Sequence, residues 1–400
     1  MTKEASFEAA LFFAAELIRI PGLPGREGDV ARRVREEMQA LGLAHVRVDE
    51  VGNVIGVARG RGEAPPVLLN AHLDVVAEGV HADWEVPPFS GEVLDGCLHG
   101  RGAMDIKGPL ALQTYAAAAM IDHAPGDVIV AHTVLEERGG LGMKHLLDSG
   151  TVDPAAVVLG EATHGDVCIG HRGRAELEIV LEGVAGHASV PGRASNALDL
   201  LGPALAAVRD LAEDQESDPV LGASSLVATM VDVRPETRNV IPDHVIVAID
   251  WRVLPGSTEE TLVKRLRDGL RQRVGSPPAG LMYDVRVATE RQRTYTGVEE
   301  DWRLFSPGFL MSPEHPAVRA AANAVGMRSG GAGAATVRPW AFATDGGWSC
   351  GVHGIPTVGF APGEERYAHT NRERLEVAEA RWAFGRYPHL IAGLQRALSA

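Results

Sequence analysis

The sequence predicts an α/β protein that carries a smaller α+β domain as an insertion, and two observations support this prediction. Short β-branched apolar segments alternate with helical apolar spacing up to residue 173 and again after residue 294, as in open sheets covered by helices. Between these parts, residues 174–294 show the order strand, helix, strand, strand, helix, strand, which is typical of a ferredoxin-like layer of helices on an antiparallel sheet. We therefore expect one discontinuous domain, formed by residues 1–173 and 295–400, and one inserted domain.

The N-terminal part of the chain contains helical, hairpin and buried-strand patterns in turn. Pro21 ends the first helical segment and Gly28 precedes the second. In chain order, the expected elements are helices over 7–20 and 29–41, a hairpin over 46–58 that turns at Gly52-Asn53, a strand at 67–69, a hairpin that turns at Asp95-Gly96, a helix over 106–120, and strands at 128–135 and 155–159.

The insertion and the C-terminal part are predicted in the same way. The insertion is expected to contain strands at 175–181, 225–233, 245–254 and 282–288 and helices over 196–211 and 259–274. The C-terminal part is expected to contain a helix over 315–325, strands at 337–342 and 355–360, and a helix over 376–398. The glycine-rich segment 329–335 predicts a flexible loop.

Composition and charge limit the class of protein. The chain has 400 residues, 45% of them hydrophobic and 23% charged, which is ordinary for a globular protein and enough for two domains. Its formal net charge of -15 argues against a nucleic-acid partner, because such proteins present basic surfaces. The N-terminus lacks the basic segment of a signal peptide, and no apolar run reaches the roughly 18 residues of a membrane span. We therefore expect a cytoplasmic protein without a membrane partner.

The three cysteines predict neither a disulfide framework nor a thiolate metal site. Cys97, Cys168 and Cys350 are odd in number, far apart in the sequence and without CxxC spacing. Each is expected to be a small buried hydrophobic residue.

Polar side chains follow three of the predicted strands. His72 and Asp74 follow the first strand, Glu136 and Glu137 close the second, and Glu161 follows the third. Because open α/β sheets place their chemistry at the carboxyl edge of parallel strands, we expect these side chains to lie close together. One acid of the Glu136-Glu137 pair could bind a metal while its neighbour acts on water.

Histidine and carboxylate groups without cysteine suit Zn²⁺, Co²⁺ or Mn²⁺ at a hydrolytic site, where one carboxylate can bridge two ions. Taken singly, each residue also has an ordinary interpretation: a hydrogen-bonded core histidine, an N-cap for Asp105 at its helix start, or a solvated acid. The set as a whole favours a two-metal hydrolase, and its candidate ligands are His72, Asp105, Glu137, Glu161 and His369.

The chain resembles the co-catalytic zinc family that includes acetylornithine deacetylase, succinyl-diaminopimelate desuccinylase, aminoacylase and glutamate carboxypeptidase. The resemblance covers nearly the whole chain, and the motifs occur in the order of the family. These motifs are His72-Leu-Asp74, Gly100-Arg-Gly-Ala-Met-Asp105-Ile-Lys-Gly108, Leu135-Glu136-Glu137, Gly160-Glu161, Gly186-His187-Ala-Ser189, Asn239-Val-Ile-Pro242 and Tyr367-Ala-His369-Thr370.

The resemblance implies a zinc-exopeptidase-like catalytic domain, in which helices flank a mixed sheet, and an inserted domain that serves as a dimerisation domain and lid. It implies two divalent ions, with Zn²⁺ first and Co²⁺ or Mn²⁺ as alternatives. Asp105 would bridge the ions, His72 and Glu161 would complete one site, and Glu137 and His369 would complete the other.

The resemblance also assigns catalytic roles. Glu136 would be the general base for a water shared by the ions, and Asp74 would orient the His72 imidazole. His187 would reach across the interface of a homodimer to stabilise the oxyanion. From its sequence context alone, His187 is equally compatible with a surface or turn position.

Three residues are candidates for substrate binding. Asn239 and Arg252 could hold a substrate carboxylate, although a surface ion pair at a strand end is an equal alternative for Arg252. Gly359 could line the pocket by permitting a close backbone approach.

The favoured function is removal of the acyl group from an N-acyl amino acid, a small-molecule substrate. Dipeptidase or carboxypeptidase action on a short peptide is the enzymatic alternative. The alternative from another class is a catalytically silent, metal-stabilised dimer that binds ligands, which the presence of Glu136 disfavours. A serine or cysteine hydrolase is a weaker alternative, since Cys168 has no evident catalytic partner in the sequence.

Overall fold

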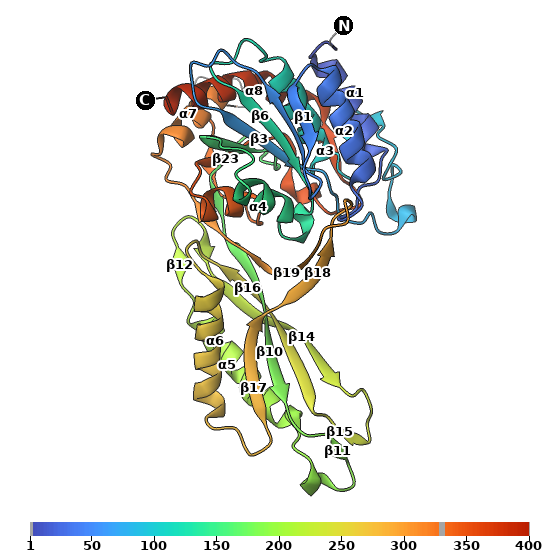
Figure 1. Cartoon of the computed structure of the whole chain (residues 1–400), viewed down its shortest axis with the longest axis vertical. Helices are drawn as coiled ribbons and strands as arrows, with labels where there is room; N and C mark the ends of the chain where they lie inside the picture. Colours follow the sequence, from blue (N-terminus) through green and yellow to red (C-terminus); the bar gives the residue numbers. More distant parts are fainter. Residues whose placement is uncertain (1–2, 328–332, 400) are drawn as a thin grey trace. The chain divides into compact units, whose positions relative to one another are not determined.

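The computed structural model describes residues 3–327 and 333–399 and divides into two compact units (Figure 1). The first unit contains Met1–His171, Gln292–Glu300 and Leu310–Ala400. The second unit contains Arg172–Arg291 and Asp301–Phe309. The chain therefore crosses between the units four times. The segment 329–335, which the sequence predicts to be a loop, lies largely outside the described residues.

The first unit is built on a mixed eight-stranded sheet, as the family resemblance implies. The four central strands β6, β3, β7 and β23 are parallel, because β3 pairs in parallel with β6 and β7, and β23 with β7. The order across the sheet is β1 (Ala44–Val48), β2 (Val54–Ala58), β6 (Val128–Thr133), β3 (Val67–His72), β7 (Ala156–Leu159), β23 (Thr357–Gly359), β8 (Val167–Cys168) and β22 (Val337–Arg338).

The strand expected at 337–342 is shorter than predicted, because β22 contains only Val337 and Arg338. Pro339 follows directly, and its nitrogen has no hydrogen to donate to a neighbouring strand. The hairpin predicted at Gly52-Asn53 is confirmed, since β1 and β2 pair antiparallel.

Helices flank this sheet (Figure 1). α3 is buried along all of its residues and packs against α1, α8 and β3, which explains its alanine-rich sequence. Ser6 caps α1 by accepting a hydrogen bond from the backbone N–H of Ala9. The helices are α1 (Phe7–Ile18), α2 (Gly28–Ala40), α3 (Lys107–Ala118), α4 (Leu141–Asp148), α7 (Pro316–Val325) and α8 (Val377–Ala397).

The second unit is an antiparallel sheet with helices on one face. Its strand order is β14, β16, β10, β17. The two central neighbours, β10 and β16, are the first and third of these strands along the chain. Alternate residues of β16 are buried, and the buried set packs with leucines of the two helices. The ferredoxin-like order predicted from the sequence is therefore confirmed. Its elements are β10 (Gly173–Glu182), α5 (Leu201–Glu213), β14 (Ser225–Arg234), β16 (His244–Val253), α6 (Glu259–Val274) and β17 (Met282–Val287).

The remaining strands are short. They are β4 (Val93–Leu94), β5 (Cys97–His99), β9 (Gly170–His171), β11 (Gly186–His187), β12 (Ser217–Asp218), β13 (Gly222–Ala223), β15 (Val240–Ile241), β18 (Thr289–Arg293), β19 (Glu299–Arg303), β20 (Phe305–Ser306), β21 (Phe309–Leu310) and β24 (Arg374–Glu376).

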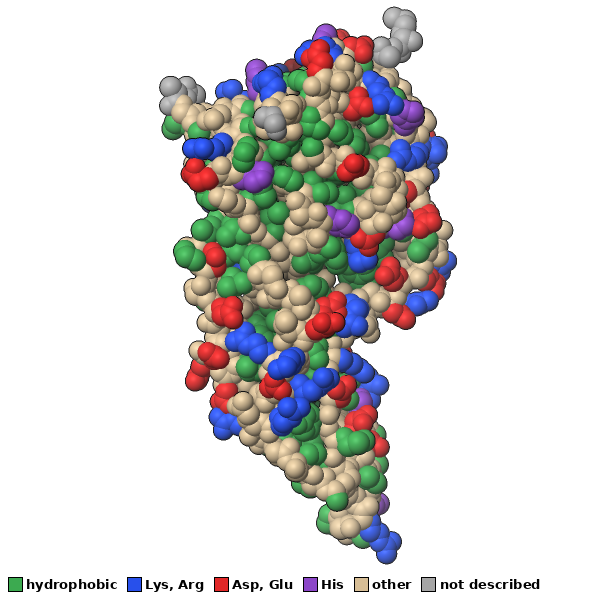
Figure 2. Space-filling model, turned by 60° about the vertical axis from the view of Figure 1, so that its left-hand side comes forward, with side chains coloured by type: hydrophobic (Ala, Val, Ile, Leu, Met, Phe, Trp, Pro, Cys, Tyr) green, Lys and Arg blue, Asp and Glu red, His purple; other side chains and the backbone are tan. Residues whose placement is uncertain are grey.

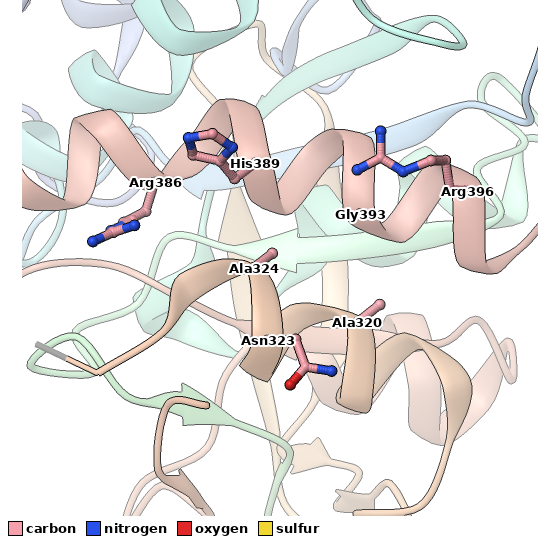
Figure 3. A pocket seen from close by; sticks show the side chains of 7 residues that line it. All are labelled: Ala320, Asn323, Ala324, Arg386, His389, Gly393 and Arg396. Carbon is pink, nitrogen blue, oxygen red and sulfur yellow. The ribbon is translucent and has the colours of Figure 1, made fainter. Parts of the chain in front are cut away.

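The surface shows no segregation of charge on the face in Figure 2, where acidic and basic side chains are interspersed. A groove of about 430 Å³ lies between α7 and α8 (Figure 3). None of the candidate site residues lines this groove, whose lining residues are Ala320, Asn323, Ala324, Arg386, His389, Gly393 and Arg396.

Two general expectations can be compared with the described residues. No helix among them has both the length and the apolar character that crossing a membrane requires. All three cysteines are free; Cys168 is buried as expected, but Cys97 and Cys350 are only half-buried.

Candidate metal centre

The sheet topology of the first unit brings the predicted strand-end residues to one edge. His72 is the last residue of β3, which lies between β6 and β7. Glu136 and Glu137 form a 3-10 turn shortly after β6, and Glu161 follows β7. Because the three strands are parallel and adjacent, their carboxyl ends present these four side chains together.

Two loops complete the set. Asp105 lies directly before α3, and His369 follows the 3-10 turn Glu365–Tyr367. Asp105 does not cap α3, because the N-cap position is Ile106 and no side chain accepts a capping hydrogen bond there. The N-cap alternative for Asp105 is therefore excluded.

The five predicted ligands form two groups that share Asp105. In one group, His72 Nε2 lies 3.2 Å from Asp105 Oδ1 and 3.6 Å from Glu161 Oε1. In the other group, His369 Nε2 lies 3.2 Å from both Asp105 Oδ2 and Glu137 Oε1. Within each group, the candidate ligand atoms all lie within 4.8 Å of one another. The two oxygens of Asp105 thus face different groups, as a bridging carboxylate must.

The donor set fits two divalent ions. Each group offers one imidazole and two carboxylates, a combination that suits Zn²⁺, Co²⁺ or Mn²⁺. The carboxylates face imidazoles, and buried carboxylates are costly unless cations balance them. Burial raises the pKa of Glu161 to about 8, even though His72 opposes this shift. Two cations would remove this unfavourable accumulation of negative charge.

The same carboxylates also change the pKa values of the two histidines. Hydrogen bonds to Asp105 and Glu137 raise the pKa of His369 to about 10. Burial alone would lower the pKa of His72, but its hydrogen bond to Asp105 and the Glu161 carboxylate raise it well above the usual value. Burial favours the neutral form of Asp105, yet hydrogen bonds from both histidines hold its pKa well below the usual range. The carboxylate oxygens that face the two imidazoles are the same atoms that two cations would bind.

Glu136 lies beside the two groups but belongs to neither. Its Oε2 is 4.0 Å from His72 Nε2, whereas the oxygens of Asp105 and Glu161 are 3.2 and 3.6 Å from the same nitrogen. Glu136 is not a member of either ligand group. Burial and the nearby Glu161 carboxylate raise the pKa of Glu136 well above its usual value. The side chain is therefore placed next to the ion sites with an increased affinity for a proton.

Asp74 contacts both His72 and the glutamate turn. His72 Nδ1 donates to the backbone carbonyl of Asp74 at 2.8 Å, whereas the Asp74 carboxylate is 3.6 Å away. That carboxylate instead accepts from the backbone N–H groups of Glu136 at 3.2 Å and Glu137 at 3.1 Å. Burial raises the pKa of Asp74 to about 6. Asp74 thus contacts the His72 imidazole through its backbone carbonyl, while its carboxylate holds the glutamate turn.

Three buried acids near the centre were not identified from the sequence. Glu27 accepts from the backbone N–H of Leu135 at 3.3 Å. Asp345 accepts from Thr133 Oγ1 at 3.0 Å, and burial raises its pKa to about 7. Glu373 accepts from the backbone N–H of Asp105 at 3.1 Å. Their partners are backbone groups or distant side chains, so no spacing in the sequence indicates them.

Gly359 allows a close approach, but of a side chain rather than a ligand. A Cβ atom at this position would lie 2.0 Å from ring atoms of Trp340. The Trp340 Nε1 donates to the backbone carbonyl of Ala162 at 2.9 Å, next to Glu161. The glycine therefore accommodates an indole that supports the Glu161 loop, and its contact with substrate stays a prediction.

The other predicted residues belong to the second unit. His187 and Asn239 lie side by side, because β11 pairs with β15 and Ala188 N donates to Asn239 O at 3.0 Å. His187 is exposed, and its Nδ1 accepts from the Ser189 backbone N–H. Arg252 forms an ion pair with Asp250 at 2.8 Å, as in the surface alternative. The structure thus places His187 beside Asn239 and pairs Arg252 with Asp250.

The chain was compared with known proteins. The family model described as "Peptidase family M20/M25/M40" matches residues 68–391. A succinyl-diaminopimelate desuccinylase from Methylorubrum populi is 31% identical over 401 residues, covering 94% of this chain and 95% of the relative. The uncharacterized protein YgeY from Escherichia coli K12 is also 31% identical, over 90% of this chain and 88% of its own length.

Solved structures with the same fold include peptidases. A tripeptidase from Staphylococcus aureus matches with a TM-score of 0.73 and 21% identity, covering 98% of this chain and 99% of that chain. A Bacillus subtilis protein described as a dinuclear metal binding peptidase from the M20 family matches with a TM-score of 0.71 and 14% identity, covering 98% and 99%. At these identities the structural matches establish the fold alone.

Proposed function

Because the chain belongs to peptidase family M20/M25/M40, whose members are metal-dependent hydrolases, we propose that it removes the acyl group from an N-acyl amino acid. The main supporting observation is the pair of ligand groups that share Asp105, with Glu136 beside them. The acyl amino acid is favoured over a peptide because the desuccinylase relative aligns along almost the whole chain.

The proposed ion ligands are His72 and Glu161 for one ion and His369 and Glu137 for the other, with Asp105 common to both. When bound, two divalent ions would lower the pKa of a water molecule and polarise the amide carbonyl. Zn²⁺ is the proposed native metal, and Co²⁺ or Mn²⁺ would suit the same ligands.

Glu136 is the proposed general base and acid. It takes a proton from the attacking water as the oxygen of that water bonds to the amide carbon, and it delivers this proton to the amine nitrogen as the carbon–nitrogen bond breaks. Its position beside the two ligand groups allows the Glu136 carboxyl group to carry the proton between the two steps. The Asp74 carboxylate keeps Glu136 in place through the backbone of the glutamate turn.

We propose that the protein is a homodimer and that His187 acts at the site of the partner subunit as an oxyanion donor. The strand β14 supports a dimer, because it lies at the edge of its sheet among the described residues and three of its apolar side chains are exposed. The exposed fractions are 55% for Val227, 58% for Met230 and 42% for Val231. A long, apolar strand edge is unfavourable in a monomer and is suited to pairing with a second copy.

Asn239 is the proposed substrate-binding residue of the second unit, because it lies beside His187. Arg252 would have to exchange its Asp250 partner for a substrate carboxylate. Because Arg252 already donates to both oxygens of Asp250, the substrate carboxylate would have to form an equally strong bidentate pair.

Two alternatives use the same residues. A dipeptidase or carboxypeptidase would hydrolyse a peptide bond at the same ligand groups. A silent ligand-binding dimer would bind two ions without turnover, and the half-buried Glu136, which lies beside the ligands but belongs to neither group, disfavours it.

The decisive experiment measures amine release from N-acetyl, N-succinyl and N-formyl amino acids and from dipeptides, with protein reconstituted with Zn²⁺ or Co²⁺. Turnover restricted to one acyl class supports the deacylase. Turnover of dipeptides alone would replace it with the peptidase, and two bound ions with no turnover across the panel would favour the binding protein. A chelator should abolish activity, and added Zn²⁺ or Co²⁺ should restore it.

A further inference from the structure

Glu373 is a buried carboxylate four residues after the proposed ligand His369. Its Oε1 accepts from two successive backbone N–H groups, that of Met104 at 3.2 Å and that of Asp105 at 3.1 Å. The backbone carbonyl of Glu373 also accepts from Gly100 N at 3.3 Å. One residue near His369 thus holds the loop that carries Asp105.

The second oxygen of Glu373 is balanced by a buried cation. Arg101 donates from its Nη1 to Glu373 Oε2 at 2.6 Å, and both side chains are almost fully buried. The Arg101 guanidinium lies 5.1 Å from the centre of the Trp84 ring, which fixes its position further. A buried ion pair with such partners is costly to break, because the remaining charge would be left unpaired.

A second buried cation contributes to the same region. Lys107 donates from Nζ to the backbone carbonyl of Ile20 at 2.6 Å. Burial lowers its pKa to about 7, against the opposing effect of the Glu373 and Asp74 carboxylates. Lys107 therefore lies in the field of both carboxylates that hold backbone groups of the centre, Asp74 under the glutamate turn and Glu373 under Asp105.

The arrangement matters because Asp105 must serve two groups at once. Its Oδ1 lies 3.2 Å from His72 and its Oδ2 lies 3.2 Å from His369. A rotation or shift of the Asp105 backbone would improve one contact and lengthen the other. The hydrogen bonds that Glu373 accepts from the backbone N–H groups of Met104 and Asp105 restrict that movement.

We propose that Glu373 is a positioning residue that fixes the backbone of Asp105 relative to His369, so that one carboxylate can hold two ions, with Arg101 as its counter-ion. The inference rests on the proposed two-ion site. Groups that orient metal ligands typically affect metal affinity by about 10- to 100-fold.

The test compares the full-length parent with Glu373→Gln and Glu373→Ala. Each metal-free protein is titrated with Co²⁺ by calorimetry and by visible absorption, and kcat and KM are measured separately. In Glu373→Gln the amide oxygen can still accept from Asp105 N, but the Arg101 ion pair is lost, so we expect about 10-fold weaker binding of one Co²⁺. Glu373→Ala loses both interactions, and we expect about 100-fold weaker binding, an altered Co²⁺ spectrum, a lower kcat and an unchanged KM.

Glu37→Gln is the matched control. Glu37 is also a buried carboxylate with two cationic partners, Lys3 at 2.6 Å and Arg33 at 2.9 Å, but it contacts none of the candidate ligands. We expect this variant to lose thermal stability while it retains two Co²⁺ ions with the parent spectrum.

The outcomes separate the two proposals. Two Co²⁺ ions bound by Glu373→Ala with the affinities and spectrum of the parent would overturn the positioning role and leave the proposed function intact. A parent that binds fewer than two ions would overturn the two-ion site itself. If Glu373→Ala does not fold, Glu373→Gln and Arg101→Lys decide the question, since parent-like Co²⁺ binding in both would also overturn the inference.

Discussion

The two units present their candidate residues in opposite ways. In the first unit, the ligand residues converge at a sheet edge, and buried carboxylates hold the backbone of the turns that carry them. In the second unit, His187 is exposed on a short strand, Asn239 is exposed in the turn before β15, and Arg252 is paired with Asp250. The difference indicates that the first unit alone contains the candidate ion ligands found among the described residues, whereas His187, Asn239 and Arg252 have surface positions in the second unit.

The largest effect is expected from Asp105→Asn. The neutral amide offers one weak oxygen ligand where two groups now share a carboxylate, so both ion sites should be weakened together. We expect fewer than two bound Zn²⁺ ions by elemental analysis and loss of activity. Asp166→Asn is the control, because Asp166 pairs with Arg338 and lies outside both groups. Two tightly bound ions in Asp105→Asn would contradict the bridging role.

The next largest effect is expected from Glu136→Gln. This change removes proton transfer but no ion ligand, so we expect two bound ions and a fall in kcat of about 10²- to 10⁴-fold. The neighbouring change Glu137→Gln should instead reduce the metal content, because Glu137 contacts His369 in one ligand group. Substantial turnover by metal-loaded Glu136→Gln would show that another group is the base.

A smaller effect is expected from His187→Ala, and it tests whether the second unit contributes to catalysis. Loss of one oxyanion donor typically lowers kcat by about 10²- to 10³-fold, while the metal content should not change. If His187 acts on the partner subunit, mixing and re-association with Glu136→Gln should restore about a quarter of the parent activity, because half of the dimers then contain one intact site. A fully active monomer would refute the shared site, and Val231→Lys on the β14 edge provides a route to that monomer.

The sequence predicts the strand-end residues well, because strand periodicity and a parallel sheet are enough to bring His72, Glu136 and Glu161 together. Asp105 and His369 lie in loops, and they were identified through motifs rather than periodicity. Glu373 could not be predicted, since its partners are backbone N–H groups 268 and 269 residues away. The sequence predicts that Asp74 meets His72, but it does not show whether the backbone carbonyl or the carboxylate of Asp74 makes the contact.

The smallest effect concerns stability, and it contrasts a buried histidine of the first unit with an exposed one of the second. His132 is buried in β6, where burial lowers its pKa to about 3. In the unfolded chain its pKa returns to about 6.5, so between these values the unfolded state binds the extra proton, and the free energy of unfolding falls as the pH decreases. This residue alone contributes up to about 1.4 kcal/mol per pH unit in that range, and nothing above it.

His132→Gln should therefore reduce the dependence of stability on pH between about 6.5 and 3, and His187→Gln is the comparison at an exposed histidine. The measurement is urea unfolding of the metal-free protein across that pH range. An equal pH dependence in His132→Gln and the parent would show that acid destabilises the first unit through its carboxylates and not through this histidine. The reduced dependence would instead show that burial of a neutral histidine directly beneath the ligand-bearing edge contributes to its acid sensitivity.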